Sequence, residues 1–306
     1  MPSNYSALPQ ATLDMVAHSI RTTELAAADL ICSKASGKTT LAGSFPVRTK
    51  LLARGENGGL GRGAEAKSHD QSAESVIYEC LAYVGEVEFY EEDEIDWDAF
   101  GEDEMTEAGK AAYADCNLAV DLKLQSILTS TSLNTEFDVT SDGAGAWSDG
   151  GAASTPLDDL YNVLVQFPGL DTLVFGAETE RYLASHPDLI AEVSNFNGGQ
   201  LDFSAVVGVL ARKLGLDPSK VHTLRNRFYN TAADGATEVI GNLMGSGLWF
   251  GTSANLHMID PGHPRNGELR FIPEERKRMT VAQMKRYIDI KRSGGANRGV
   301  TFTGIA

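Results

Sequence analysis

The chain lacks several features that define common classes of protein. No stretch of its 306 residues approaches the ~18 uninterrupted apolar residues of a membrane-spanning helix. Its three cysteines, Cys32, Cys80 and Cys116, are odd in number and far apart, which argues against a disulfide framework and fits a reducing cytosol. The N-terminus has no charged segment followed by an apolar run, so we expect no secretory signal. With 42% apolar and 22% charged residues, the composition is that of one or two globular domains.

Basic residues are absent from one long stretch. Between Glu86 and Glu107 the chain has twelve acidic residues and no Lys or Arg. Between Arg265 and Arg298 the balance reverses, with ten basic and four acidic residues, 10 − 4 = +6. The net charge of −16 excludes a protein that clamps nucleic-acid phosphates over its whole surface. The acidic block and the basic end can pair within or between subunits, or simply be a solvated face and a tail.

The sequence also lacks a convincing catalytic constellation. Ser36–Thr40 (SGKTT) resembles the end of a phosphate-binding loop, but the first glycine of that motif is replaced by Cys32. Gly59–Ala64 fits the dinucleotide pattern G-x-G-x-x-A only loosely and follows no convincing strand. We therefore expect no catalytic or cofactor-binding residue and no cofactor.

Metal binding is not predicted either. His257, Asp260 and His263 are ligand types, but their spacing matches no zinc motif, and Asp-Pro-Gly explains the segment as a turn. The carboxylates of residues 86–107 form one exposed run, which offers no contrast of environment to separate the pKa values of a catalytic pair.

The first third of the chain reads as an arm followed by a long hairpin. Residues 1–32 carry a helical pattern too weak to fold alone. Phe45–Arg54 and Val76–Phe89 read as two strands, and the glycine-rich segment Gly55–Ser72 between them reads as a tip. Because an isolated hairpin is marginal in water, it must rest on another surface.

The clearest helix is Thr106–Thr129, with apolar residues at steps of three and four, among them Cys116, Val120, Leu124 and Ile127. It would span about 36 Å, which suggests an elongated molecule. A compact α/β region follows, with helices predicted at 157–167, 177–185 and 204–214 and strands at 172–176, 221–224, 238–240, 247–251, 269–272, 286–291 and 300–305.

This order of segments resembles the major capsid proteins of tailed bacteriophages, whose Hong Kong ninety-seven type fold is shared with encapsulins. The resemblance covers nearly the whole chain. It is carried mainly by Glu88–Leu128 and by Trp147–Val193, in which a Trp and a Pro-led helix precede the segments TLVFG and LASHPDL. Val206–Asn230 and Gly241–Phe250 add further matches.

The resemblance implies an α+β fold of four parts. Residues 1–32 would be an N-terminal arm, and residues 33–90 an extended β-hairpin loop with its tip at 55–72. Residues 91–155 and 266–306 would form a peripheral domain with a spine helix at 106–129, and residues 156–265 an axial domain.

The resemblance also implies a structural protein rather than an enzyme. Copies would assemble into hexamers and pentamers of an icosahedral head that encloses double-stranded DNA, contacted non-specifically. Assembly would take place in the host cytoplasm, the product would be a virion, and no membrane would be involved. The expected partners are further copies of the chain, a portal and a cement or decoration protein. A separate scaffolding protein, or none, is expected because the arm is too short to contain a scaffold segment.

Two alternatives stay open at this point: an encapsulin-like compartment, and a soluble acidic α/β enzyme with the glycine-rich loop as a lid. For a shell protein, charge suggests inter-subunit contacts between cations of the hairpin and the acidic stretch of a neighbour. The candidate residues are Arg48, Lys50, Arg54 and Arg62 on one side and Glu91, Glu92, Asp93 and Glu94 on the other. Cys116, Val120, Leu124 and Ile127 are expected to pack the spine helix.

Overall fold

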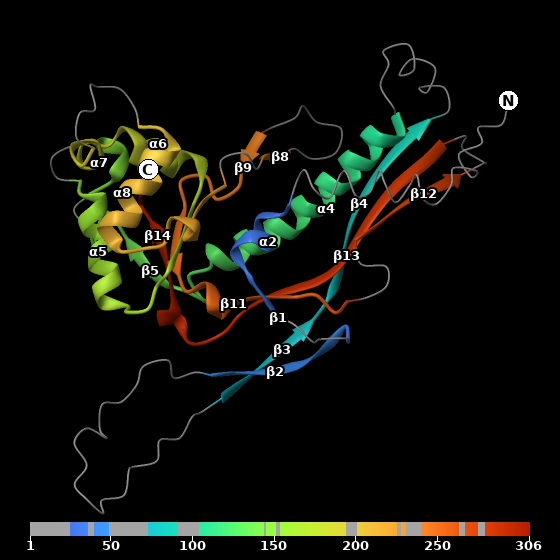
Figure 1. Cartoon of the computed structure of the whole chain (residues 1–306), viewed down its shortest axis with the longest axis horizontal. Coiled ribbons are helices and arrows are strands. Elements are labelled where there is room, and N and C mark those ends of the chain that lie inside the picture. Colours follow the sequence, from blue (N-terminus) through green and yellow to red (C-terminus); the bar gives the residue numbers. More distant parts are fainter. Residues whose placement is uncertain are drawn as a thin grey trace, which may run out of the picture.

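The structure is a computed structural model that describes most of the chain. The described residues are 25–35, 40–48, 73–90, 104–143, 145–150, 154–193, 201–224, 228–230, 240–262, 267–274 and 279–306. They form an elongated lobe built around one long helix and a compact lobe built around four shorter ones (Figure 1).

The elongated lobe is organised by strand β13 (Met279–Arg292). Its first part lies between β4 (Leu81–Tyr90) and β12 (Glu268–Glu274), and its last part pairs with β11 (Leu256–Ile259), all antiparallel. The short strand β1 (Ser33–Ala35) adds to β11 in parallel. Helix α4 (Glu104–Leu128) runs along this sheet, and helix α2 (Ala27–Ile31) lies beside α4 (Figure 1).

Small residues bring α4 close to the sheet. Ala112 and Cys116 of the helix are fully buried against Ala282 and Met284 of β13. Where α4 passes β4, a Cβ placed on Gly85 would lie 2.0 Å from the Ala112 carbonyl oxygen and 2.7 Å from the Cys116 nitrogen. Only glycine allows this approach.

The compact lobe contains a sheet with the order β5-β14-β10-β6-β7. β6 and β10 are buried throughout, as their continuous apolar sequences TLVF and LWFG require. The sheet pairs are antiparallel except β5 with β14 and β6 with β7. The strands are β5 (Thr135–Asp138), β6 (Thr172–Phe175), β7 (Val221–Thr223), β10 (Leu248–Gly251) and β14 (Gly299–Thr303).

Helices pack against this sheet and share its core. Leu173 and Phe175 face the helices, whereas Val174 between them belongs to a second core shared with α2, α4, β11 and β13. Trp249 of β10 joins Val174 in that second core, so the sheet is covered on both faces. The helices are α5 (Pro156–Gln166), α6 (Ala177–Ser185), α7 (Pro187–Ala191) and α8 (Phe203–Leu214).

Two small two-stranded sheets complete the described structure. β2 (Ala42–Arg48) and β3 (Ala73–Glu79) form the base of a hairpin, and β8 (Phe228–Asn230) pairs with β9 (Ile240–Asn242). Two proline residues lie in strands with few partners. Pro46 is in β2, and Pro273 is in β12, which pairs with β13 alone among the described strands.

Single turns of 3-10 helix connect several of these elements. They are η3 (Trp147–Asp149), η4 (Pro218–Lys220), η5 (Ser253–Asn255) and η6 (Ala296–Arg298).

The structure corrects three sequence expectations. Val76–Phe89 is not one strand: it divides at Cys80 into β3, which pairs with β2, and β4, which pairs with β13. The strand β11, which contains His257, was not predicted; the Asp-Pro-Gly segment follows it, with the Gly262 N–H donating to Asp260 Oδ1. Pro187 does not merely end α6 but opens α7.

Strand pairing also crosses the expected domain boundaries. β4 and β11, assigned to the extended loop and the axial domain, pair with β13 of the elongated lobe. β5 and β14, assigned to the peripheral domain, lie in the sheet of the compact lobe. Composition could not reveal these pairings because the partners are distant in sequence.

We predict that Gly85→Ala destabilises the protein by about 1–3 kcal/mol, because the added methyl group forces α4 away from β4. The free energy of unfolding measured in urea checks this. Gly208→Ala on α8 is the matched control, since a Cβ there meets nothing within 4 Å and alanine favours helix. Equal stability of the two variants would contradict the close approach.

Candidate assembly surfaces

The N-terminal segment is fixed to the elongated lobe by a buried ion pair. Arg286 of β13 donates to both carboxylate oxygens of Asp29, at 3.0 and 3.1 Å, and to Asn117 Oδ1 at 2.9 Å. The Arg286 and Asp29 side chains are only 11% and 9% exposed. Burial alone would lower the pKa of Arg286, but the hydrogen bond and charge of Asp29 outweigh it and raise the pKa above its ordinary value. The Arg286 guanidinium therefore stays charged and holds α2 against the elongated lobe.

Apolar packing accompanies this ion pair. Ala26, Ala27 and Ala28 are buried, and the Ala28 N–H donates to Asp121 Oδ1 on α4 at 3.2 Å. On the outer side of the same segment, Leu25 and Leu30 are 48% and 61% exposed. The segment is thus anchored on one side and exposes apolar side chains on the other.

The hairpin is attached to the elongated lobe at Cys80, where β3 ends and β4 begins. The Glu79 N–H donates to Asp289 Oδ2 at 2.9 Å, and Lys291 lies 3.2 Å from the same oxygen. Phe45 of β2 meets the His257 ring edge-on at 5.1 Å between centroids. These contacts fix the direction in which the hairpin leaves the body, while Ile77 on its outer face is 75% exposed.

Among the described elements, α4 covers one face of the sheet of the elongated lobe. Because residues alternate between the faces of a strand, the face away from α4 carries Glu86 of β4, Gln283 of β13 and Arg270 of β12 in one row. Gln283 donates to Glu86, and Arg270 pairs with Glu268 at 2.7 Å. The same face also carries the exposed apolar side chains of Val84 and Ile272, and Glu268, Lys285 and Tyr287 line a small hollow on it.

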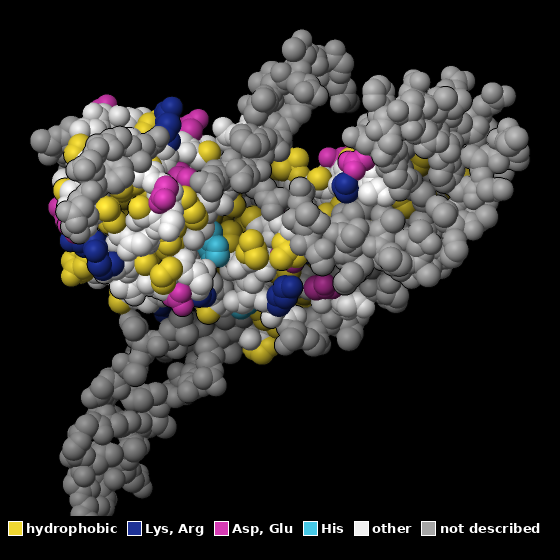
Figure 2. Space-filling view, turned by 45° about the horizontal axis from the view of Figure 1, so that its top comes forward, with side chains coloured by type: hydrophobic (Ala, Val, Ile, Leu, Met, Phe, Trp, Pro, Cys, Tyr) yellow, Lys and Arg dark blue, Asp and Glu magenta, His cyan; other side chains and the backbone are white. Residues whose placement is uncertain are grey.

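Large apolar side chains are exposed at several separate places, and Figure 2 shows apolar and charged side chains interleaved over the compact lobe and the middle of the molecule. On α5, Tyr161 and Val165 lie one turn apart and are 54% and 63% exposed. The remaining exposed side chains come from the N-terminal segment, the hairpin, β4, α4 and the loop after it, and β12: Leu25, Leu30, Leu41, Ile77, Leu81, Val84, Leu122, Leu133 and Ile272. They offer several small surfaces rather than one large patch.

The residues predicted for the spine helix are placed as a packing face. Cys116, Val120 and Leu124 are 0% exposed, and Ile127 is 6% exposed. Burial raises the pKa of the Cys116 thiol to about 11, so this cysteine is an inert packing residue rather than a nucleophile.

Most of the predicted inter-subunit residues lie outside the described residues. These are Lys50, Arg54, Arg62, Glu91, Glu92, Asp93 and Glu94. For Arg48 the structure describes the backbone, which pairs with Ala73 at the end of β2. The glycine-rich tip at 55–72 also lies outside the described residues. Sequence reasoning missed the Arg286–Asp29 anchor, whose partners are far apart in the chain.

One cluster in the compact lobe contains the residue types of a hydrolase triad. His186 Nε2 lies 3.0 Å from Ser154 Oγ, and His186 Nδ1 accepts a hydrogen bond from the Asp188 N–H at 3.2 Å. Burial is the main cause that lowers the pKa of His186, so the ring is neutral and its proton sits on Nε2. The ring then donates to Ser154 and cannot take the serine proton. The cluster caps α7 and is not arranged for nucleophilic catalysis.

Of the three ligand-type residues between His257 and His263, two are described, and each has a hydrogen-bond partner within the chain. His257 Nε2 lies 2.8 Å from Ser293 Oγ, Asp260 accepts from the Gly262 N–H, and His263 lies outside the described residues. Among the residues that the structure describes, no group of three His, Cys, Asp or Glu is placed to hold a metal ion. No helix in the described ranges is both long and apolar enough to span a membrane.

Comparison with known proteins identifies the fold. No protein-family model and no curated protein sequence matches the chain. Among solved structures, a phage-related protein from Bordetella bronchiseptica is 13% identical with a TM-score of 0.64, over 95% of this chain and 97% of that chain. A structure from Mycobacterium phage Che8 is 10% identical with a TM-score of 0.53, over 92% of each chain. A virus-like particle from Pyrococcus furiosus is 13% identical with a TM-score of 0.51, over 96% of this chain and 98% of that chain.

These similarities cover 92–96% of this chain. They show that the chain has the Hong Kong ninety-seven type major capsid fold. The α+β capsid fold expected from the sequence is thus confirmed.

We predict that Arg286→Met destabilises the protein by about 3 kcal/mol, because the buried Asp29 carboxylate loses both hydrogen bonds of the guanidinium and keeps only Lys34, at 3.9 Å, as a counter-charge. The double variant Arg286→Met with Asp29→Leu should recover much of this loss. Urea unfolding of the two single variants and the double variant measures the coupling. Additive effects would show that the two side chains do not interact.

We also predict that the free energy of unfolding decreases as the pH falls below 6.5, the ordinary pKa of histidine. Burial lowers the pKa of His186, His222 and His257 in the folded state, so below pH 6.5 the unfolded chain binds protons that the folded chain refuses. In His186→Asn the side-chain oxygen can still accept from Asp188 but does not titrate. The loss of unfolding free energy between pH 7.5 and pH 5.5 should be smaller in this variant; an unchanged loss would exclude His186 as a contributor.

Proposed function

We propose that this chain is a structural protein whose copies assemble into a closed shell. The observation that carries the proposal is the agreement of fold over nearly the whole chain with the Che8 phage structure and the Pyrococcus virus-like particle. Because a fold can serve several functions, the proposal also needs support from the surface of this chain.

Two features of the surface support self-association. The N-terminal segment and the hairpin are each tied to the body by polar anchors, at Arg286 and at Asp289, and each exposes apolar side chains outward. Neighbouring copies can bury these side chains, at about 25 cal/mol per Å². Many small repeated contacts suit a closed symmetric assembly.

We further propose that the shell consists of hexamers and pentamers and encloses double-stranded DNA as the head of a tailed phage, with a scaffolding protein, a portal and a decoration protein as partners. The net charge of −16 suits a container that must hold DNA without binding it tightly. In this reading α4 is the spine helix, the elongated lobe is the peripheral domain and the compact lobe is the axial domain.

A protein compartment that encloses a cargo protein is the second candidate. It is favoured by the similarity to the Pyrococcus particle, which covers as much of this chain as the phage structures do. The contents of purified particles distinguish the two: packaged nucleic acid supports the phage head, and a single co-purifying protein supports the compartment.

The test of the proposed function is expression of the full chain followed by sedimentation and negative-stain microscopy. Closed particles of uniform size are expected, either from the chain alone or after co-expression with phage proteins. Monomers or dimers under all conditions and concentrations would overturn the proposal and favour an enzyme.

We predict that Leu124→Asp abolishes particles, because it buries a charge in the core shared by α4 and both lobes. Leu122→Asp is the matched control on the same helix, since Leu122 is 36% exposed whereas Leu124 is 0% exposed. Circular dichroism should show loss of folded structure only for Leu124→Asp. Normal particles from that variant would show that this face of the helix is not needed.

We predict that reversing the charges of Arg48 and Lys50 together to Glu weakens assembly if these residues meet the acidic stretch of a neighbour. The yield of particles should fall and its dependence on salt should change sign or disappear. Light scattering between low and high salt measures both. Wild-type yield and wild-type salt dependence would exclude the proposed contact with Glu91, Glu92, Asp93 and Glu94.

A further inference from the structure

Three segments of the chain cross between the two lobes: residues 129–134, 252–255 and 293–298. The first crossing is fastened by buried neutral groups. Asn134 Nδ2 donates to the Ile127 carbonyl at 2.8 Å, and Trp249 Nε1 donates to Asn134 Oδ1 at 3.0 Å. Both Asn134 and Trp249 are buried and neither side chain titrates, so changes in salt concentration or pH do not weaken these hydrogen bonds.

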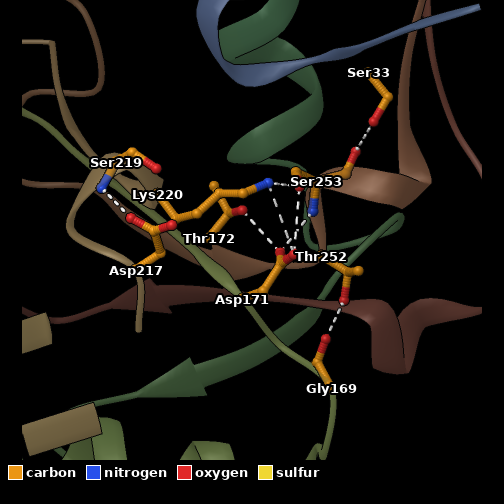
Figure 3. Close-up of polar contacts among 9 residues, drawn as sticks. All are labelled: Ser33, Gly169, Asp171, Thr172, Asp217, Ser219, Lys220, Thr252 and Ser253. Atoms are coloured by element: carbon orange, nitrogen blue, oxygen red, sulfur yellow. Dashed lines mark hydrogen bonds and ion pairs between the residues drawn. The ribbon is translucent and has the colours of Figure 1, made fainter. Parts of the chain in front are cut away.

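The second crossing is held in a different way, through Ser253 (Figure 3). The Ser253 N–H donates to Asp171 Oδ1 at 2.9 Å, its hydroxyl lies 2.5 Å from Lys220 Nζ, and its carbonyl accepts from Ser33 Oγ at 2.7 Å. The hydroxyl also lies 3.4 Å from Asp171 Oδ2, so Ser253 contacts three segments of the chain, those of Asp171, Lys220 and Ser33.

The segments that meet at Ser253 belong to different parts of the molecule. Asp171 directly precedes β6, and Lys220 ends the short helix before β7, so both are fixed to the compact lobe. Ser33 begins β1, which belongs to the sheet of the elongated lobe and follows the N-terminal helix α2. The Thr252 hydroxyl adds a bond to the Gly169 carbonyl at 2.8 Å.

The charges at this crossing remain accessible to solvent. Lys220 Nζ lies 3.8 Å from Asp171 Oδ2, with the two side chains 37% and 45% exposed. An ion pair with this exposure is screened by salt and yields to a competing charged group, unlike the buried bonds of Asn134. Of the first two crossings, the second is therefore the one whose contacts salt or a competing charged group can weaken.

We infer that Asp171, Lys220 and Ser253 form a salt-sensitive latch that fastens the crossing at residues 252–255 to the edge of the compact lobe. Through Ser33 the latch also senses the position of the N-terminal segment. This inference concerns the single chain and does not depend on what the chain builds.

Its consequence for a shell rests on the proposed function. The curvature of a closed shell follows from the angle between the parts of its subunit, and a shell with both hexamers and pentamers needs the same chain to accept more than one angle. A latch of modest strength at one crossing, beside a firm connection at another, permits such a change without unfolding.

Lys220→Met tests the latch, because it removes the charge and keeps most of the aliphatic chain. In hydrogen–deuterium exchange of the purified full chain, exchange of the peptide that contains residues 252–255 should rise about fivefold. High salt should produce a similar rise in the wild type. Exchange of this peptide in Lys220→Arg should stay near the wild-type value. Lys213→Met is the matched control: Lys213, on α8, pairs with Glu192, and its replacement should leave exchange of this peptide unchanged.

Unchanged exchange at residues 252–255 in Lys220→Met would overturn the latch. In particles, the distribution of diameters should broaden in Lys220→Met but not in Lys213→Met. Raised exchange with an unchanged distribution would overturn the role in curvature while leaving the latch itself supported. Absence of particles from the wild type would overturn the proposed function, and the exchange measurement would still decide the latch.

Discussion

The elongated lobe depends on the pairing of one strand. β13 pairs with β4 and β12 along its first part and with β11 along its last part, and it also carries Arg286 and Asp289. The first of these residues holds the N-terminal segment, and the second holds the elbow of the hairpin. A single strand therefore sets the positions of the two segments that leave the body, so their geometry relative to each other is fixed before any neighbour binds.

The two lobes are linked through a core that neither could complete alone. Val174 and Trp249 project from the sheet of the compact lobe into the space between α4 and the strands β11 and β13. The helix contributes Val120, Leu124 and Leu128 to this core, and α2 closes it from the N-terminal side. A charge placed in this core destabilises the packing of both sheets, whereas exposed polar contacts at its edge can change with little loss of unfolding free energy. This division between a firm interior and an adjustable rim suits a subunit that must be rigid and yet fit more than one environment.

The sequence was sufficient to predict the elements that are determined locally. The three- and four-residue spacing of Cys116, Val120 and Leu124 gave the long helix to within two residues at each end, and the continuous apolar segments TLVF and LWFG gave two buried strands. It was not sufficient where the partner is distant. Nothing in residues 76–89 alone shows that pairing changes from β2 to β13 at Cys80, because the signal lies in Asp289 and in the register of β13. The same holds for the Arg286–Asp29 pair, whose members are 257 positions apart. The predicted inter-subunit cations and acids lie almost entirely outside the described residues, so that contact stays a prediction.

The prolines in β2 and β12 have a consequence for the life of the chain before it meets its partners. Proline offers no N–H, so Pro46 and Pro273 interrupt the row of donors along strands that would otherwise be templates for another strand. We expect these two interruptions to make open-ended cross-β pairing between newly made subunits less favourable at β2 and β12.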